Sequence, residues 1–469
     1  MKRDVAAFEQ YLQNRIEEKG YPGVAVCIRG PEGVLFEKGF GYRSLKRQTK
    51  VDGNTVFGIA SMSKSFTTLA CCILQTEGKL DLEDPISNYF PDLHIPGLPD
   101  EAVTLKLLGM HRAGIPPMEP LEWSISMNSV ERNTEMHRHL VKAAPNKMDT
   151  IQQIIEYINA CKYGSLGSPG EYMSYSNEGY ALLSYVVDQA AGITLEEFLN
   201  ERIFKPLGMN RSILDIDCSE ARALTGDDNI TSLFSIDEND QLIEDDDWSV
   251  LPPFRGCGLI KSTALDVSKY YQMLSDKGRF EGRQVIPEEA VELLVGSEYP
   301  LRKEPYYCQG LRKSLIGGKI ACDHGGGLHG VSTHGGFIEG GYSAAALCNG
   351  SELDMETVQW ICFNYILGLP LETEHHWAVP SGKDFSCPEM ICGDYIAYEG
   401  VPTHCIISME NGKLACKYRD EKKDIRHCHS TVFAIFDSET GEREITFRFH
   451  IRDGIAWGVN CGSRIYQRM

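Results

Sequence analysis

The sequence lacks a long apolar run. No segment of its 469 residues is long and apolar enough to span a bilayer. The N-terminal segment MKRDVAAFEQYLQNRIEEKG begins with Lys2 and Arg3, but the apolar core of an export signal does not follow them. We therefore expect a cytoplasmic protein that does not enter a membrane, with a non-classical export route left open.

Basic residues and metal-binding cysteine motifs are also scarce. The chain has 46 Lys and Arg against 66 Asp and Glu, a net charge of −20. Such a surface repels phosphate backbones, so nucleic acid is not an expected partner. The 16 cysteines do not form the paired CxxC knuckles of a zinc finger. Several lie in apolar runs, as Cys27 and Cys348 do, so we expect buried free thiols and predict neither a metal nor an organic cofactor.

Most of the chain has the pattern of a mixed α and β domain. Residues 23–29 read as a strand, a turn with Gly30-Pro31 follows, and VLFEKGFGY returns as a second strand. Strands recur near residues 343–347, after a largely helical middle. This order predicts an α+β domain over residues 1–370, in which the terminal segments join one antiparallel sheet flanked by helices, beside an all-helical region.

The C-terminal part has a different pattern of residue types. Residues 371–386 are rich in polar residues and turn formers and are typical of a linker. Beyond them, Ile445, Phe447, Phe449 and Ile451 alternate with polar residues, which is the period of a strand with one buried face. Residues 387–469 therefore read as a small all-β domain, lipocalin-like or another barrel.

Two further segments of the sequence each allow two interpretations. Between Pro116 and Pro169, a run that includes Met118, Met127, Met136 and Met148 is either a lid over a site or ordinary helical packing, and packing is favoured. Residues 237–247 hold seven acids, which indicate a calcium loop or, more strongly, a solvated loop.

The first chemistry-bearing motif is Ser61-Met62-Ser63-Lys64, at the head of a largely apolar run of helix length. Residues three apart share a face of a helix, so Ser61 and Lys64 would lie side by side. A serine at a helix start has backbone N–H groups nearby, and a lysine can accept its proton if burial keeps the amine partly uncharged. By itself the pattern is weak, and a surface helix is the alternative.

The second motif is Tyr175-Ser176-Asn177, just before another helical run. A phenol placed between a lysine and a serine can relay a proton. Asn177 offers a donor and acceptors suited to a substrate amide. The alternative is that Tyr175 packs in the core and Asn177 caps the helix.

The third motif is His324-Gly325-Gly326-Gly327, ahead of the strand-like GYSAAALCNG. Glycines there let a substrate backbone lie against an edge strand, and a backbone N–H can complete an oxyanion hole. The alternative is a simple glycine-rich turn.

The order of these motifs resembles the serine β-lactamase and penicillin-binding-protein superfamily, in particular its class C β-lactamase-related hydrolases. The resemblance covers roughly residues 20 to 367. It runs through PGVAVCI, FGIASMSKSFTT, LLGMHRAGIPP, PGEYMSYSNEGYALLSYVV, IFKPLGM, GCGLIKSTALDVSKYYQML and HGGGLHG.

The resemblance implies a role for each motif residue. Ser61 would be the acylated nucleophile, Lys64 the general base and Tyr175 its partner. The substrate-binding residues would be Asn177, His324, Gly326 and Gly327, and the N–H groups of Ser61 and Gly327 would form the oxyanion hole.

The sequence also departs from the family pattern. His324 stands where many members have the lysine of Lys-Thr-Gly, which weakens carboxylate recognition because histidine is mostly neutral at pH 7. Ala113 stands where a serine is usual, and Cys257 interrupts what is often a Gly-Gly pair.

These features together predict a serine hydrolase that cleaves small peptide or amide substrates, including D-amino-acid ones, through an acyl-enzyme on Ser61. A carboxylesterase or weak β-lactamase is the first alternative, and a non-catalytic penicillin-binding-like protein the second. The expected partners are a small-molecule or peptide substrate and further copies of the chain, joined through the C-terminal β domain.

Overall fold

The computed structural model describes residues 4–128, 148–226, 228–237, 241–296, 304–351, 353–400 and 402–469. Met136, in the candidate lid, lies outside these ranges. None of the described helices combines the length and the apolar character that a membrane span requires.

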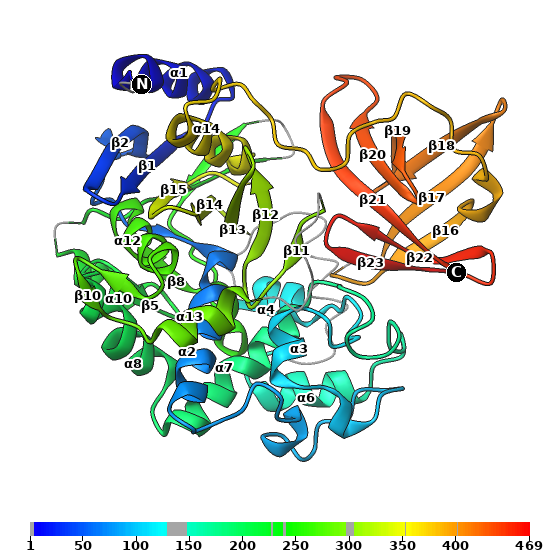
Figure 1. Ribbon diagram of the computed structural model, residues 1–469, viewed down its shortest axis with the longest axis horizontal. Coiled ribbons are helices and arrows are strands. Elements are labelled where there is room, and N and C mark those ends of the chain that lie inside the picture. Colours follow the sequence, from blue (N-terminus) through cyan, green and yellow to red (C-terminus); the bar gives the residue numbers. More distant parts are fainter. Residues whose placement is uncertain are drawn as a thin grey trace.

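An eight-stranded antiparallel sheet forms the centre of the larger part of the molecule (Figure 1). Its order is β11 (Tyr306–Tyr307), β12 (Arg312–Ile316), β13 (Lys319–Leu328), β14 (Val331–Ile338), β15 (Tyr342–Cys348), β1 (Gly23–Gly30), β2 (Gly33–Ser44) and β3 (Thr49–Lys50). Strand β1 pairs with β15, so segments from the two ends of this part of the chain meet in the middle of the sheet, as the sequence predicts.

Helices cover both faces of the sheet because the β1 side chains alternate between them. Val24 and Val26 pack in a core with α1 (Val5–Glu18) and α14 (Met355–Leu367). Ala25 and Cys27 belong to a second core on the opposite face. The helix α12 (Ala264–Ser275) lies on that face, against β1, β14 and β15. The result is three layers, the architecture predicted from the sequence.

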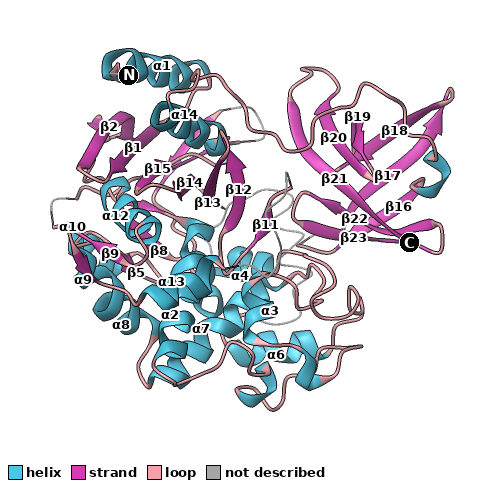
Figure 2. Ribbon diagram, in the orientation of Figure 1, coloured by secondary structure: helices cyan, strands magenta, loops and turns pink. Residues whose placement is uncertain are grey.

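The second core continues into a helical region, which lies below the sheet in Figure 2. Its helix α2 (Ser63–Thr76) is buried from Ser63 to Leu74, and the nucleophile candidate Ser61 lies two residues before it. The other helices are α3 (Leu105–Gly109), α4 (Pro120–Asn128), α6 (Ile151–Asn159), α7 (Asn177–Ala191), α8 (Leu195–Leu199), α9 (Lys205–Leu207), α10 (Ser219–Thr225), α11 (Arg255–Gly258) and α13 (Glu288–Val295).

Three small sheets complete the larger part of the molecule. They are β4 (Phe57–Gly58), β8 (Ile260–Ser262) and β5 (Ile213–Leu214); β6 (Leu233–Ile236) and β7 (Leu242–Asp245); and β9 (Arg279–Phe280) and β10 (Arg283–Gln284).

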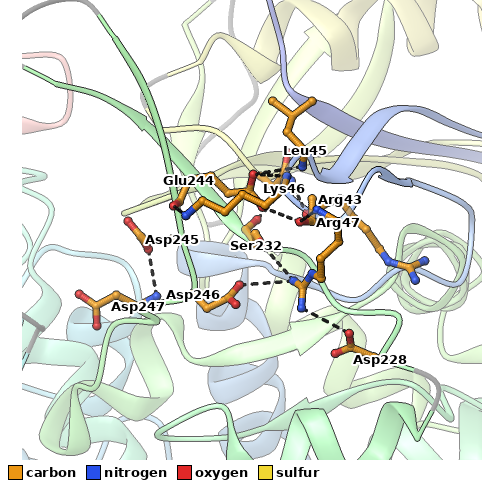
Figure 3. A network of polar contacts seen from close by, with 12 residues as sticks. Arg43, Leu45, Lys46, Arg47, Asp228, Ser232, Glu244, Asp245, Asp246 and Asp247 are labelled. Carbon is orange, nitrogen blue, oxygen red and sulfur yellow. Dashed lines mark hydrogen bonds and ion pairs between the residues drawn. The ribbon is translucent and has the colours of Figure 1, made fainter.

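The acidic segment around β7 is tied to a basic turn that follows β2, as Figure 3 shows. The Glu244 carboxylate accepts from the backbone N–H groups of Leu45 at 3.1 Å and Lys46 at 2.8 Å. Arg47 pairs with Asp246 at 3.6 Å. These contacts favour an ion-paired hairpin over a calcium loop.

The C-terminal part is a closed antiparallel barrel, seen in Figure 2 as a separate group of strands. Its strands are β16 (Gly393–Ala397), β17 (Thr403–Glu410), β18 (Lys413–Tyr418), β19 (Glu421–His429), β20 (Val432–Asp437), β21 (Arg443–Arg452), β22 (Ile455–Cys461) and β23 (Arg464–Arg468). Phe447 and Phe449 point into its core, as their alternation predicts. The barrel is confirmed, whereas the boundaries at 370 and 387 stay predictions.

Candidate active site

Ser61 lies in the short 3-10 helix η1 (Ala60–Met62), between β4 and the start of α2. The turn into η1 is tight, because Ala60 has a positive φ of 45°, which residues other than glycine rarely adopt. The Thr333 hydroxyl on β14 donates to the Ile59 carbonyl oxygen at 3.1 Å and fixes this turn to the sheet. Ser61 is therefore held two residues before the start of α2 and not inside its first turn.

Lys64 lies beside Ser61, as their spacing predicts. Its Nζ donates to Ser61 Oγ at 3.1 Å and to the Cys257 carbonyl oxygen at 3.1 Å. The side chain is fully buried. A buried lysine whose amine touches a serine hydroxyl has the geometry required for proton transfer between them.

Tyr175 covers the other side of Lys64. The Lys64 Nζ lies 4.8 Å from the centre of the tyrosine ring. The loop that carries Tyr175 ends at Ser176, whose hydroxyl accepts from the Gly179 N–H at 3.2 Å and caps α7. Asn177, two residues after Tyr175, is thus the first residue of α7 rather than its cap, and its side chain is buried.

His111 packs against the same tyrosine. Its ring centre lies 4.1 Å from that of Tyr175, and its Nδ1 accepts from the Ser176 N–H at 3.0 Å. Burial lowers the pKa of His111 well below its usual value, and the charge of Lys64 acts in the same direction. The imidazole is therefore neutral near pH 7.

His324 reaches the site from β13, with its ring centre 6.1 Å from that of Tyr175. Its Nδ1 bonds to the Gly325 carbonyl oxygen, so Nδ1 carries the proton and Nε2 accepts from the Tyr307 hydroxyl. Burial lowers the pKa of His324 to about 3, with a further contribution from Lys64. His324 thus supplies hydrogen bonding here without a positive charge.

The glycines after His324 bring β13 close to η1. A Cβ at Gly326 would lie 2.4 Å from the Ile59 carbonyl oxygen, so no larger residue fits there without a shift. A Cβ at Gly327 would meet no atom within 4 Å, which leaves open space beside it. In the described chain, β12 pairs with β13 only up to Asp323, so the later half of β13 pairs only with β14.

The barrel closes one side of this site. The N–H of Tyr175 donates to the Ser463 carbonyl oxygen at 2.8 Å, and the N–H of Ile465 donates to Ser174 Oγ at 3.1 Å. Between these two bonds, the Arg464 guanidinium lies 4.6 Å from the centre of the Tyr175 ring. The hairpin between β22 and β23 is therefore a wall of the site.

One group of side chains in the described part of the chain has the spacing of a metal site, and it lies in the barrel. Glu421, Asp437 and Glu444 converge there. The Lys423 ammonium already lies among them, at 2.6 Å, 3.3 Å and 2.6 Å respectively. An internal cation thus already pairs with all three carboxylates.

The structure brings Ser61, Lys64, Tyr175 and His324 together. Of the other motif residues, Asn177 begins α7, Gly326 lies against the turn before η1, and Gly327 follows it on β13. Sequence reasoning missed His111, Tyr307 and Arg464. His111 lies in LLGMHRAGIPP, a motif that the resemblance includes, and this could have drawn attention to it. Arg464 had no such signal, because its neighbour Ile465 contacts Ser174 from 291 residues away.

Comparison with known proteins finds similar proteins both by sequence and by structure. Penicillin-binding protein 4* of Bacillus subtilis (strain 168) is 28% identical over 213 residues, 45% of this chain and 42% of that protein. The chain thus matches less than half the length of this curated relative. The octameric penicillin-binding protein homologue from Pyrococcus abyssi aligns over 99% of both chains at 22% identity, with a TM-score of 0.67.

A further solved structure shares the larger part of the fold. D-amino acid amidase from Ochrobactrum anthropi SV3 aligns over 74% of this chain and 91% of its own, at 22% identity and a TM-score of 0.57. The family model described as Beta-lactamase matches residues 8–359, which include every motif discussed above. The chain therefore belongs to the beta-lactamase family.

Proposed function

We propose that this protein is a serine hydrolase that cleaves amide bonds through an acyl-enzyme on Ser61. The observation that carries the proposal is the 3.1 Å contact between Lys64 Nζ and Ser61 Oγ in a buried site that Tyr175 covers. Membership of the beta-lactamase family supports a hydrolase.

The reaction follows from this arrangement in two steps. Lys64, assisted by Tyr175, accepts the Ser61 proton while Oγ attacks the substrate carbonyl. The N–H groups of Ser61 and Gly327 stabilise the oxyanion. The proton then passes to the departing amine as its bond to the carbonyl carbon breaks. Water, activated by the same two side chains, releases the acid and restores Ser61.

Further observations favour amides as the substrates. The D-amino acid amidase likeness favours small amides, including those of D-amino acids. Asn177, at the start of α7, has the donor and acceptors that an amide needs. His324 holds no charge near pH 7, which argues against a site specialised for β-lactam carboxylates through β13.

Active-site labelling tests the proposal. A fluorophosphonate probe should add its mass to the wild-type chain and should not label Ser61→Ala. Ser65→Ala is the matched control, because Ser65 is a buried serine of α2 whose hydroxyl donates to the Met62 carbonyl oxygen. Rates on D- and L-amino-acid amides and on nitrophenyl esters then separate amidase from esterase. A wild-type chain that stays unlabelled would contradict the proposal.

We also propose that the chain self-associates, since the Pyrococcus abyssi homologue is described as octameric. Light scattering on the whole chain measures this directly, and a monomer mass at micromolar concentration would contradict it.

A further inference from the structure

The candidate site contains a permanent positive charge that comes from the barrel. Three basic side chains act electrostatically on His111: Lys64, His324 and Arg464. His324 is neutral near pH 7, and Lys64 is engaged with Ser61. A guanidinium keeps its proton throughout the working pH range, so Arg464 is the member of this trio suited to hold an anion.

The arginine is held rigidly beside the proposed catalytic residues. Backbone bonds on either side of it, from Tyr175 N–H to Ser463 O and from Ile465 N–H to Ser174 Oγ, fix the hairpin to the Tyr175 loop. Its own guanidinium stacks at 4.6 Å from the Tyr175 ring centre. The Arg464 guanidinium is therefore positioned to contact a ligand that binds next to Tyr175.

Glu399 balances the charge of Arg464 in the resting site. Its carboxylate accepts from Arg464 Nη2 at 2.6 Å and also pairs with Arg464 Nε, while Nη1 donates to Ser463 Oγ at 3.1 Å. Although burial opposes it, the Glu399 carboxylate raises the pKa of Arg464 above its ordinary value. An arginine has five N–H donors, so these two partners leave donors for a further carboxylate. The side chain of Arg464 keeps 29% of its surface exposed.

We propose that Arg464 is the anion-binding residue of this active site and that the substrate carries a carboxylate which binds it next to Tyr175. This rests on the proposed function. The β13 position that has a lysine in many relatives has a neutral histidine here, and the barrel hairpin supplies the charge from the other side of the site.

Glu399 then has a defined part in recognition. It keeps the guanidinium paired while the site is empty, and a substrate carboxylate shares or replaces it. This makes a prediction that a purely structural ion pair does not: removal of Arg464 weakens carboxylate binding, and neutralisation of Glu399 strengthens it.

Protection of Ser61 from the fluorophosphonate probe measures this binding. The competitors are N-acetylphenylalanine, with a free carboxylate, and N-acetylphenylalaninamide, each as D and L forms. In the wild type, the carboxylate should protect about tenfold or more better than its amide, because charge-assisted hydrogen bonds contribute this much. Arg464→Gln should abolish the difference, Arg464→Lys should keep part of it, and Glu399→Gln should enlarge it.

Arg426→Gln is the matched control, since Arg426 is another barrel arginine that pairs with a carboxylate, that of Asp424. It should leave the difference unchanged. Equal protection by acid and amide in the wild type, or a full difference retained in Arg464→Gln, would overturn the proposal. So would a loss of binding in Glu399→Gln, if its circular dichroism matches that of the wild type.

The test separates the two proposals. If the wild type is never labelled, the serine-hydrolase proposal fails, and titration calorimetry of the same acid and amide then decides the role of Arg464. Heat of binding for the acid that disappears in Arg464→Gln would support the anion site, and no heat in the wild type would reject it.

Discussion

The backbone N–H of Tyr175 donates to the carbonyl oxygen of Ser463 across 2.8 Å. This bond joins the loop before α7 to the hairpin between β22 and β23, so the barrel directly contacts the residue proposed to assist Lys64. The C-terminal barrel is therefore part of the wall of the proposed site.

The first prediction concerns the neighbouring bond at this junction. Ser174→Ala removes the acceptor of the Ile465 N–H and leaves a buried donor unpaired. We expect it to lower the free energy of unfolding by about 1–3 kcal/mol and to reduce kcat several-fold, because the Tyr175 loop loses support. Denaturant unfolding and steady-state kinetics measure the two effects.

The control for that variant is Ser184→Ala. Ser184 is also a buried serine, but its hydroxyl donates only within α7, to the Ala181 carbonyl oxygen. It should leave kcat unchanged. Equal losses of kcat in the two variants would mean that the barrel junction does not support the site.

The second prediction concerns the charge of His324. Burial lowers its pKa to about 3, so its Cε1–H resonance should not move between pH 8 and pH 5, where an unperturbed histidine titrates near pH ~6.5. NMR on wild type and His324→Gln identifies the signal. A midpoint between pH 6 and 7 would contradict a neutral His324.

The lowered pKa of His324 also makes the stability of the fold depend on pH. Because the pKa of His324 is lower in the folded state than the usual 6.5, the unfolded chain takes up this proton first as the pH falls. The stability that depends on a neutral His324 is complete above about pH 6.5 and is lost toward pH 3. His324→Gln should flatten this acid limb of the unfolding curve.

The third prediction concerns Glu178, next to Asn177 in α7. Burial raises its pKa to about 7, so the folded state holds this proton more tightly than the unfolded state. Stability should fall as the pH rises from about 4.5 to 7, by on the order of 3 kcal/mol. Glu178→Gln should remove this loss, and Tm between pH 5 and pH 8 measures it.

Glu32 provides the comparison, since its side chain is exposed in the turn between β1 and β2. Glu32→Gln should retain the wild-type pH profile. If Glu178→Gln also retains it, the Glu178 carboxyl is not the titrating group.

The fourth prediction concerns Glu244, at the basic turn of Figure 3. Glu244→Ala removes a carboxylate that accepts from two backbone N–H groups. We expect a loss of about 1–3 kcal/mol in the free energy of unfolding. Asp246→Ala, which removes only a 3.6 Å contact to Arg47, should cost at most about 0.5 kcal/mol.

Calcium tests the alternative reading of the same segment. If the segment is an ion-paired hairpin, millimolar calcium should leave the Tm of the wild type unchanged. A rise in Tm that Glu244→Ala abolishes would restore the calcium-loop interpretation.

Local pattern was enough to predict much of this protein. The alternation at Phe447 and Phe449 predicted barrel strands, because side chains of a strand alternate between its two faces. The three-residue spacing of Ser61 and Lys64 predicted their contact, because it matches one turn of a helix. The resemblance added Tyr175, and the fold places it against Lys64.

Other features depended on tertiary structure. Sequence spacing cannot show that Arg464 stacks on Tyr175, because that contact forms only when the barrel docks on the loop before α7. Nor can it show that His324 is neutral, because its pKa follows from burial and from the charge of Lys64. The sequence by itself indicated which residues could perform the chemistry, since helical spacing pairs Ser61 with Lys64 and the family resemblance supplies the others. Only the folded chain decided which of them carry charge, since burial and distant neighbours set that.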